Sequence, residues 1–313
     1  MLRWSFRAMA SPIALCAPTA AAAGWAEAAR RVQAVFAEVE DAATRFRRSS
    51  PWMRLIGSLG VWQTVPRLLA DLALAADAWR AATGGLFDPR ILPQLVRAGY
   101  AGAPLPAALP AGPPDPWWEM QPHADPRLCR MRLWWPADLG GIGKGFACDR
   151  AALAIHPLLA DFALDAGGDI ALWGRGDDPT GRWTTGIEDP RPGGGLLACF
   201  AAQAPVAVAT SAARRRAVPG EHRVGAHIID PRTGAPVDAG IAGVTVVADT
   251  VVAAEVTAKT LLLAGLPALA GSEDWSRPVW WVDSAGALFG NRAARAALQT
   301  AGTASTPGEA LAR

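Results

Sequence analysis

Two lysines stand out among the residues that could do chemistry, because the chain has only these two in 313 residues, against 28 arginines. Lys144 lies in a glycine-dense segment, and Lys259 follows a carboxylate, Glu255, by four positions. A lysine ammonium is a compact point charge that often meets phosphate groups. Both lysines are therefore candidate phosphate contacts. The alternative is that they persist by chance and that Lys259 forms an ordinary helix ion pair.

The segment around Lys144 reads Asp-Leu-Gly-Gly-Ile-Gly-Lys-Gly over residues 138–145 and joins an extended stretch to a helix. Glycines let a backbone approach a ligand closely, and a helix N-terminus offers N–H groups to an anion. The segment is not a P-loop, because no Ser or Thr follows the lysine, and it is not a dinucleotide fingerprint. It predicts phosphate contact; the alternative is a glycine-rich helix start with an exposed lysine.

Three further features could belong to the same site. Residues 165–170, Asp-Ala-Gly-Gly-Asp-Ile, place two glycines inside a strand pattern, which indicates either close backbone approach to a ligand or a tight strand crossing. Thr210 and Ser211 begin a polar, Arg-rich run whose hydroxyls and guanidinium groups suit phosphate oxygens, or which is a solvated loop. His227 follows that run and is either a catalytic or a structural histidine.

Glu255 and Lys259 lie on one face of a predicted helix. As a surface pair at this spacing they would contribute about 0.2–0.5 kcal/mol. As a functional pair, both side chains would project toward one site.

The elements that must position these residues alternate without a regular strand–helix–strand order. Helical periodicity predicts helices at residues 25–47, 65–82, 91–98, 143–159 and 250–264. Strand patterns occupy residues 9–15, 127–135, 161–173, 182–188, 196–202, 206–209, 226–229, 242–248 and 279–282. This order predicts an α+β fold in which helices pack on mixed or antiparallel sheets.

Composition narrows the class of protein. A net charge of +2 gives no basic field for nucleic acid, and four widely spaced cysteines predict neither a zinc site nor a disulfide framework. No apolar run reaches the length needed to cross a membrane, so no membrane-spanning helix is expected. Residues 8–23 are apolar after Arg3 and Arg7, as in a signal peptide, but Pro12 and Pro18 interrupt them. A cytoplasmic protein is expected, with export as the alternative.

Taken in order, these motifs closely resemble the FAD:protein FMN transferase family (ApbE-like proteins). The resemblance is carried by Met9-Ala-Ser11 and by residues 83–89, 138–150, 165–170, 183–190, Thr210-Ser211, 227–237 and the Glu255 helix. It covers roughly residues 4–290. It implies a T-fold-like α+β architecture and one domain over residues 1–299. Composition predicts a Pro-rich loop at 101–116 and a disordered tail at 300–313.

The resemblance also implies the activity. The family splits the pyrophosphate of FAD, releases AMP and joins FMN through a phosphoester to a Thr or Ser hydroxyl of an acceptor protein. Such chemistry depends mainly on positioning and charge neutralisation. The family normally uses Mg²⁺ on the pyrophosphate oxygens.

Residue roles carry over by position. The implied nucleotide-binding residues are Met9, Leu86, Phe87, Asp88, Asp138, Lys144, Thr210, Ser211 and Ile228. The Gly141 carbonyl and the Glu255 carboxylate would hold the metal ion. His227 would be the general base for the incoming hydroxyl, since neutral imidazole is competent near neutral pH.

Lys259 departs from the family pattern, which commonly has a threonine oxygen at this position. An ammonium has no lone pair and cannot bind Mg²⁺. Either the ion moves to other oxygens or Lys259 replaces part of its charge. Two alternatives to transfer therefore stay open: a non-catalytic flavin-binding protein, and a pyrophosphatase that cleaves FAD to FMN and AMP.

Overall fold

The computed structural model describes residues 1–19, 23–99, 105–106, 108–176, 178–213, 228–237 and 240–300. The helices are α1 (Trp25–Ala43), α2 (Pro51–Gly57), α3 (Arg67–Ala82), α4 (Leu92–Arg97), α5 (Gly143–Ile155), α6 (Val251–Ala264), α7 (Leu266–Gly271) and α8 (Arg292–Thr300). The strands are β1 (Leu2–Ala8), β2 (Ser11–Ala17), β3 (Gln63–Pro66), β4 (Trp118–Pro122), β5 (Leu128–Leu133), β6 (Phe162–Ala166), β7 (Ile170–Trp173), β8 (Trp183–Glu188), β9 (Leu196–Ala202), β10 (Val206–Ala212), β11 (Ile241–Ala248), β12 (Val279–Asp283) and β13 (Leu288–Gly290).

Eight strands form the main antiparallel sheet in the order β1-β2-β6-β7-β10-β11-β12-β13. Its first hairpin turns at Met9 and Ala10, both with positive φ (51° and 58°), as a two-residue type I′ turn requires. Gly167 and Gly168 have positive φ in the same way at the β6–β7 turn. Both turns carry residues that the sequence marks as candidates.

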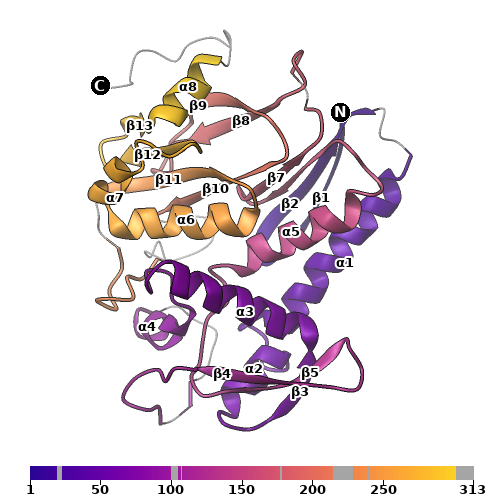
Figure 1. The fold of residues 1–313 in the computed structure, drawn as a ribbon, viewed down its shortest axis with the longest axis vertical. Coiled ribbons are helices and arrows are strands. Elements are labelled where there is room, and N and C mark those ends of the chain that lie inside the picture. Colours follow the sequence, from indigo (N-terminus) through magenta and orange to yellow (C-terminus); the bar gives the residue numbers. More distant parts are fainter. Residues whose placement is uncertain are drawn as a thin grey trace.

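Helices α1, α5 and α6 cover the main sheet (Figure 1). A buried apolar cluster joins α1 and α5 to β1, β2 and β6, with Phe36, Ile13 and Phe162 fully buried in it. Helix α6 packs against β10 and β11. The sheet and its helices thus bring the start of α6 against α5.

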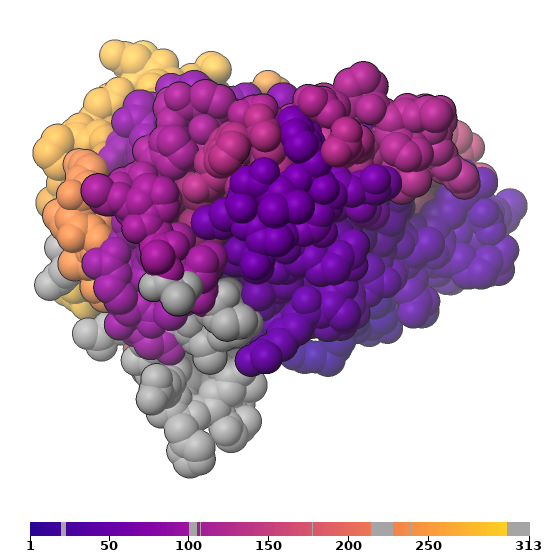
Figure 2. Space-filling model, turned by 90° about the horizontal axis from the view of Figure 1, so that it is seen from below, coloured from indigo at the N-terminus to yellow at the C-terminus, as the bar shows by residue number. Residues whose placement is uncertain are grey.

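A smaller region below α6 is built from the three-stranded sheet β3-β5-β4 with α2 and α3 (Figure 1). Seen from below, segments from the first half of the sequence form the centre of this face (Figure 2). Its apolar cluster includes Trp52, Trp117, and also Val252 and Val256 of α6. Helix α6 therefore lies between the main sheet and this smaller region.

The predicted α+β class is confirmed, and the strand expected at the start of the chain is β2 of the main sheet. Several bounds differ. The first helix ends at Ala43, because Thr44 takes an extended conformation. The second begins at Arg67, because residues 63–66 pair with β5 instead. Strand β10 extends to Ala212 and so contains Thr210 and Ser211.

The sequence prediction omits β1, β3, β4, β13, α2, α7 and α8. Of the strand predicted at 226–229, the first two residues lie outside the described ranges, and Ile229 forms only a bridge to Pro236. Of the predicted tail, Thr300 ends α8, and residues 301–313 are outside the description. In the part of the chain that is described, no helix combines the length and apolar character needed to cross a bilayer.

Candidate functional site

Helix α6 carries Glu255 and Lys259, and its start is fixed by two side chains. The hydroxyl of Thr250 accepts a hydrogen bond from the Ala253 N–H at 3.1 Å. The carboxylate of Asp149 on α5 accepts from the Val251 and Val252 N–H groups at 2.8 and 3.0 Å. These bonds satisfy N–H groups that a helix start leaves without partners. Asp149 therefore ties the N-terminus of α6 to α5.

We expect the burial of the Asp149 carboxyl to make the free energy of unfolding depend on pH. Burial raises the pKa of the Asp149 carboxyl, although the two N–H donors act in the opposite direction. The folded state then holds the proton more tightly, so this group's contribution is complete at pH below the ordinary carboxyl pKa and is lost as pH rises through the raised folded pKa. Asp149→Asn has no carboxyl to titrate, so its free energy of unfolding should not fall across that pH window. The difference between variant and parent should therefore shift in favour of the variant as pH rises. Urea denaturation over a pH series measures it.

Asp249→Asn is the matched control for that experiment. Asp249 is an exposed carboxylate that pairs with Arg277 near the same helix start. The free energy of unfolding of Asp249→Asn should change with pH in the same way as that of the parent. An Asp149→Asn curve parallel to the parent would contradict the expectation.

Glycine at position 145 allows α5 and α6 to meet. A Cβ there would lie 2.8 Å from Glu255 Oε2 and 3.0 Å from the backbone nitrogen of Val252. The Gly145 N–H donates to the same Glu255 oxygen at 3.0 Å. The glycine-dense segment thus serves a close helix–helix approach, and the Glu255 side chain is buried at the contact.

Both lysines of the chain converge on Glu255. Lys144 Nζ is 3.8 Å and Lys259 Nζ is 3.7 Å from the same oxygen, Glu255 Oε1. Lys144 also forms an ion pair with Asp169, which follows the two turn glycines of the β6–β7 hairpin. The carboxylate side chains are only 6% and 4% exposed, whereas those of Lys144 and Lys259 are 26% and 18% exposed. An approaching ligand therefore meets ammonium groups, not carboxylates.

Lys259 also reaches the glycine-dense segment from the other side. Its ammonium donates a hydrogen bond to the Gly141 carbonyl and lies 5.8 Å from the centre of the Phe87 ring. A Cβ at Gly141 would lie 3.1 Å from Lys259 Nζ and 3.3 Å from Phe87 Cε2. The predicted site residues Phe87, Gly141, Glu255 and Lys144 are thus close together around Lys259.

Asp88 and Asp138 lie on connected loops beside the lysine cluster, which consists of Lys144, Lys259, Glu255 and Asp169. The Asp138 N–H donates to the Pro89 carbonyl at 2.7 Å, and its Oδ1 accepts from the Gly140 N–H at 3.0 Å. Buried Arg45 approaches Asp138 Oδ1 at 3.3 Å. Asp88 forms a bidentate pair with Arg90 at 2.7–3.1 Å, so its carboxylate holds the local turn. A nucleotide contact from Asp88 would require Arg90 to move.

Met9 brings the β1–β2 turn to the start of α5. Its Cε would lie 3.3 Å from a Cβ at Gly143, and its backbone N–H donates to Glu40 Oε2 at 2.9 Å. The neighbouring Ser11 closes on Gly167, where a Cβ would lie 3.0 Å from the serine Cβ. Leu86 is half-buried on the turn that precedes Phe87. The two N-terminal motifs therefore flank the lysine cluster.

Three of the remaining predicted residues, Thr210, Ser211 and Ile228, lie on or near the strands that pack against α6. Thr210 is exposed and shares a hydrogen bond of 2.9 Å with Thr245 on β11, and Ser211 is buried. Ile228 is buried in the apolar cluster that includes Ala258 of α6. His227 precedes Ile228 directly but lies outside the described residues, so its predicted role stays a prediction.

The donor set at Gly141 and Glu255 does not fit a divalent metal ion. Lys259 Nζ already donates to the Gly141 carbonyl, and one Glu255 oxygen accepts from the Gly145 N–H. An ammonium supplies donors and no lone pair. Within the described ranges, no group of three or more His, Cys, Asp or Glu is placed to hold a metal. No step of the chemistry proposed below therefore passes through a metal ion.

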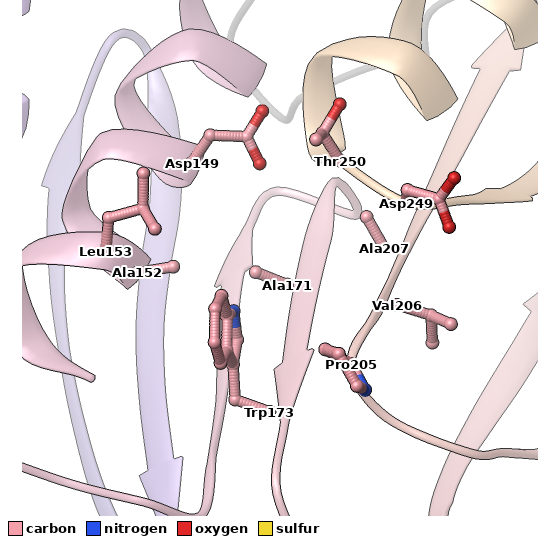
Figure 3. Close-up of a pocket in the computed structure, with 10 residues that line it drawn as sticks. All are labelled: Asp149, Ala152, Leu153, Ala171, Trp173, Pro205, Val206, Ala207, Asp249 and Thr250. Carbon is pink, nitrogen blue, oxygen red and sulfur yellow. The ribbon is translucent and has the colours of Figure 1, made fainter.

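A separate hollow of about 90 Å³ lies between α5, α6, β7 and β10 (Figure 3). Its lining includes Asp149, Leu153, Trp173, Pro205 and Thr250. None of the residues predicted for the nucleotide or the metal lines it. It is distinct from the lysine cluster.

Sequence reasoning did not assign a role to three residues that organise the site. Asp169 stands in a motif that was recognised, but its role as the partner of Lys144 depends on the β6–β7 turn geometry. Asp149 acts on a helix that begins about a hundred residues later in the chain. Arg45 follows a helix end and shows no local signal of its contact with Asp138.

Comparison with known proteins supplies an independent line of evidence. The ApbE family model matches residues 9–274. A comparison with curated proteins finds no match. The chain is similar in fold to the flavin transferase ApbE from Vibrio cholerae, with a TM-score of 0.73 and 20% identity over 95% of this chain and 99% of that one.

Two further solved structures have the same fold. The apbe protein from Thermotoga maritima gives a TM-score of 0.74 at 20% identity, over 95% of this chain and 99% of that one. The apo form of the Pseudomonas stutzeri flavinyl transferase ApbE gives 0.72 at 18%, over 95% and 96%.

Proposed function

This chain belongs to the ApbE family, and from that premise we propose that it is a flavin transferase that attaches FMN from FAD to a Thr or Ser hydroxyl of an acceptor protein. The names of its structural neighbours, flavin transferases from Vibrio cholerae and Pseudomonas stutzeri, support this choice. The ordered motifs of the sequence, which resemble those of the FAD:protein FMN transferases, also support it.

The proposed reaction is a phosphoryl transfer without oxidation or reduction. The acceptor hydroxyl oxygen attacks the phosphorus on the riboflavin side of the FAD pyrophosphate and forms a new P–O bond. The bond from that phosphorus to the bridging oxygen breaks, and AMP leaves with the bridging oxygen. The hydroxyl proton passes to a base, for which His227 is the candidate.

The observation that carries the proposal is the meeting of both lysines at Glu255. Phosphoryl transfer is accelerated mainly by positioning and by neutralising the charge on phosphate oxygens. Two partly exposed ammonium groups above buried carboxylates provide such charge. In the proposal the pyrophosphate lies at Lys144 and Lys259, and the nucleotide runs along Met9, Phe87 and Asp138.

The proposed base, His227, directly precedes Ile228 in the sequence. Ile228 packs with α6, which also carries Glu255 and Lys259. Thr210 and Ser211 lie on the strand beneath that helix.

A second candidate is flavin binding without transfer. The observation that favours it is the hydrogen bond from Lys259 to the Gly141 carbonyl, because the family resemblance assigns that carbonyl to a metal ion. Hydrolysis of FAD to FMN and AMP is a third outcome of the same site if water replaces the acceptor hydroxyl.

One incubation separates the three. The protein is mixed with FAD, Mg²⁺ and a threonine-containing acceptor protein, and products are read by intact mass spectrometry and by nucleotide chromatography. We expect the acceptor to gain the mass of FMN less one water, with an equal amount of AMP. An acceptor variant with Thr→Val at the modified position is the control. AMP without adduct would indicate hydrolysis, and bound, intact FAD would indicate the carrier.

A further inference from the structure

The site already contains a cation at the position that the family resemblance assigns to the metal ion. Lys259 Nζ donates to the Gly141 carbonyl and lies 3.7 Å from Glu255 Oε1, so it contacts both of the predicted metal ligands at once. The Lys259 side chain also fills the space beside Gly141, where a Cβ would lie 3.1 Å from Lys259 Nζ. A metal ion bound to both groups would have to displace this ammonium.

The surroundings hold the ammonium in place. The Phe87 ring lies 5.8 Å away, at a distance that suits a cation–π contact. Glu255 is fixed in turn by the Gly145 N–H, at a helix contact that leaves no room for a side chain at position 145. The Lys259 ammonium is thus held by contacts with a carbonyl, a carboxylate and an aromatic ring.

Each ion-paired carboxylate of the cluster has an ammonium partner without a metal ion. Lys144 and Lys259 supply two positive charges, and Glu255 and Asp169 supply two negative ones. Because the carboxylates are buried and the ammonium groups are partly exposed, an anion can reach the positive side of the cluster. A divalent ion would instead be placed next to two ammonium groups, which repel it.

We propose that Lys259 is the resident cation of this site, and that it neutralises the FAD pyrophosphate in place of a divalent metal ion. The inference rests on the proposed function for the identity of the nucleotide. It goes further in stating that FAD binding by this chain does not require a divalent ion. The ammonium would donate hydrogen bonds to the phosphate oxygens instead of coordinating them.

Titration of FAD by tryptophan fluorescence, in EDTA and again in Mg²⁺, tests this directly. The wild-type protein should bind FAD with the same Kd in both buffers to within about twofold. Lys259→Met keeps the length of the side chain and removes its charge. It should weaken binding about tenfold or more in both buffers, as loss of a charge-assisted hydrogen bond does.

Lys259→Thr supplies the second, diagnostic variant. It frees the Gly141 carbonyl and adds a hydroxyl oxygen, so Mg²⁺ should strengthen its FAD binding whereas the parent shows no such dependence. Direct titration with Mn²⁺, followed by electron paramagnetic resonance, should show saturable binding in Lys259→Thr and none in the parent. Thr260→Ala, one position along the helix, should behave like the parent, and circular dichroism checks that each variant is folded.

The outcomes separate this inference from the function on which it rests. Wild-type binding of FAD that needs Mg²⁺, or saturable Mn²⁺ binding by the wild type, would overturn the role of Lys259 and leave the proposed function standing. Unchanged FAD affinity in Lys259→Met would do the same. No FAD binding by the wild type in either buffer would overturn both.

Discussion

Replacement of His227 by alanine should lower the rate of FMN transfer by about 10²–10⁴-fold, the usual effect of removing a general base. FAD affinity should stay within about twofold, because the proposed pyrophosphate contacts are made by Lys144 and Lys259. Single-turnover transfer to a threonine-containing acceptor, together with FAD titration, measures both quantities.

The matched control is His123→Ala. His123 is an exposed histidine whose ring nitrogen accepts a hydrogen bond from the Asp125 N–H at 3.0 Å, on the turn after β4. Its removal should leave transfer unchanged. Full transfer activity in His227→Ala would assign the base to another residue, and Asp138 would be the next to test.

Glu255→Leu should have the largest effect on stability, a loss of about 3 kcal/mol in the free energy of unfolding. The change leaves two ammonium groups without their shared carboxylate and deprives the Gly145 N–H of its acceptor. The lower end of the usual range for a broken buried pair applies, because both ammonium groups are partly exposed. Urea denaturation of the protein without nucleotide measures it.

Glu273→Leu serves as the control for that measurement. Glu273 and Arg295 form an ion pair in which both side chains are well exposed to solvent. Such exposed pairs contribute little to stability, so the variant should unfold at nearly the same urea concentration as the parent. If the two variants were equally stable, Glu255 would not be the anchor of the lysine cluster.

Local sequence pattern was sufficient to single out residues that lie together in the structure, whereas their roles in nucleotide binding stay predictions. The glycine-dense segment before α5 singled out Lys144, and the i,i+4 spacing singled out Glu255 and Lys259. In the structure both lysines lie next to the Glu255 carboxylate. The α+β class also followed from the order of the elements. The single-domain organisation over residues 1–299 stays a prediction.

Contacts between distant segments could not be read in this way. That Lys144 and Lys259 share one oxygen depends on how α5 crosses α6, and that crossing depends on Gly145. The seven missed elements are short or lie at sheet edges and region boundaries, where burial is decided by partners far away in sequence. Strand β3, for example, exists because it pairs with β5.

The most direct test of the central claim, that the two lysines form the pyrophosphate site, is a crystal structure of the protein with FAD bound. The account predicts phosphate oxygens within hydrogen-bond distance, about 3 Å, of Lys144 Nζ and Lys259 Nζ. A pyrophosphate bound away from both lysines, for instance in the hollow beside Asp149 and Trp173, would contradict it.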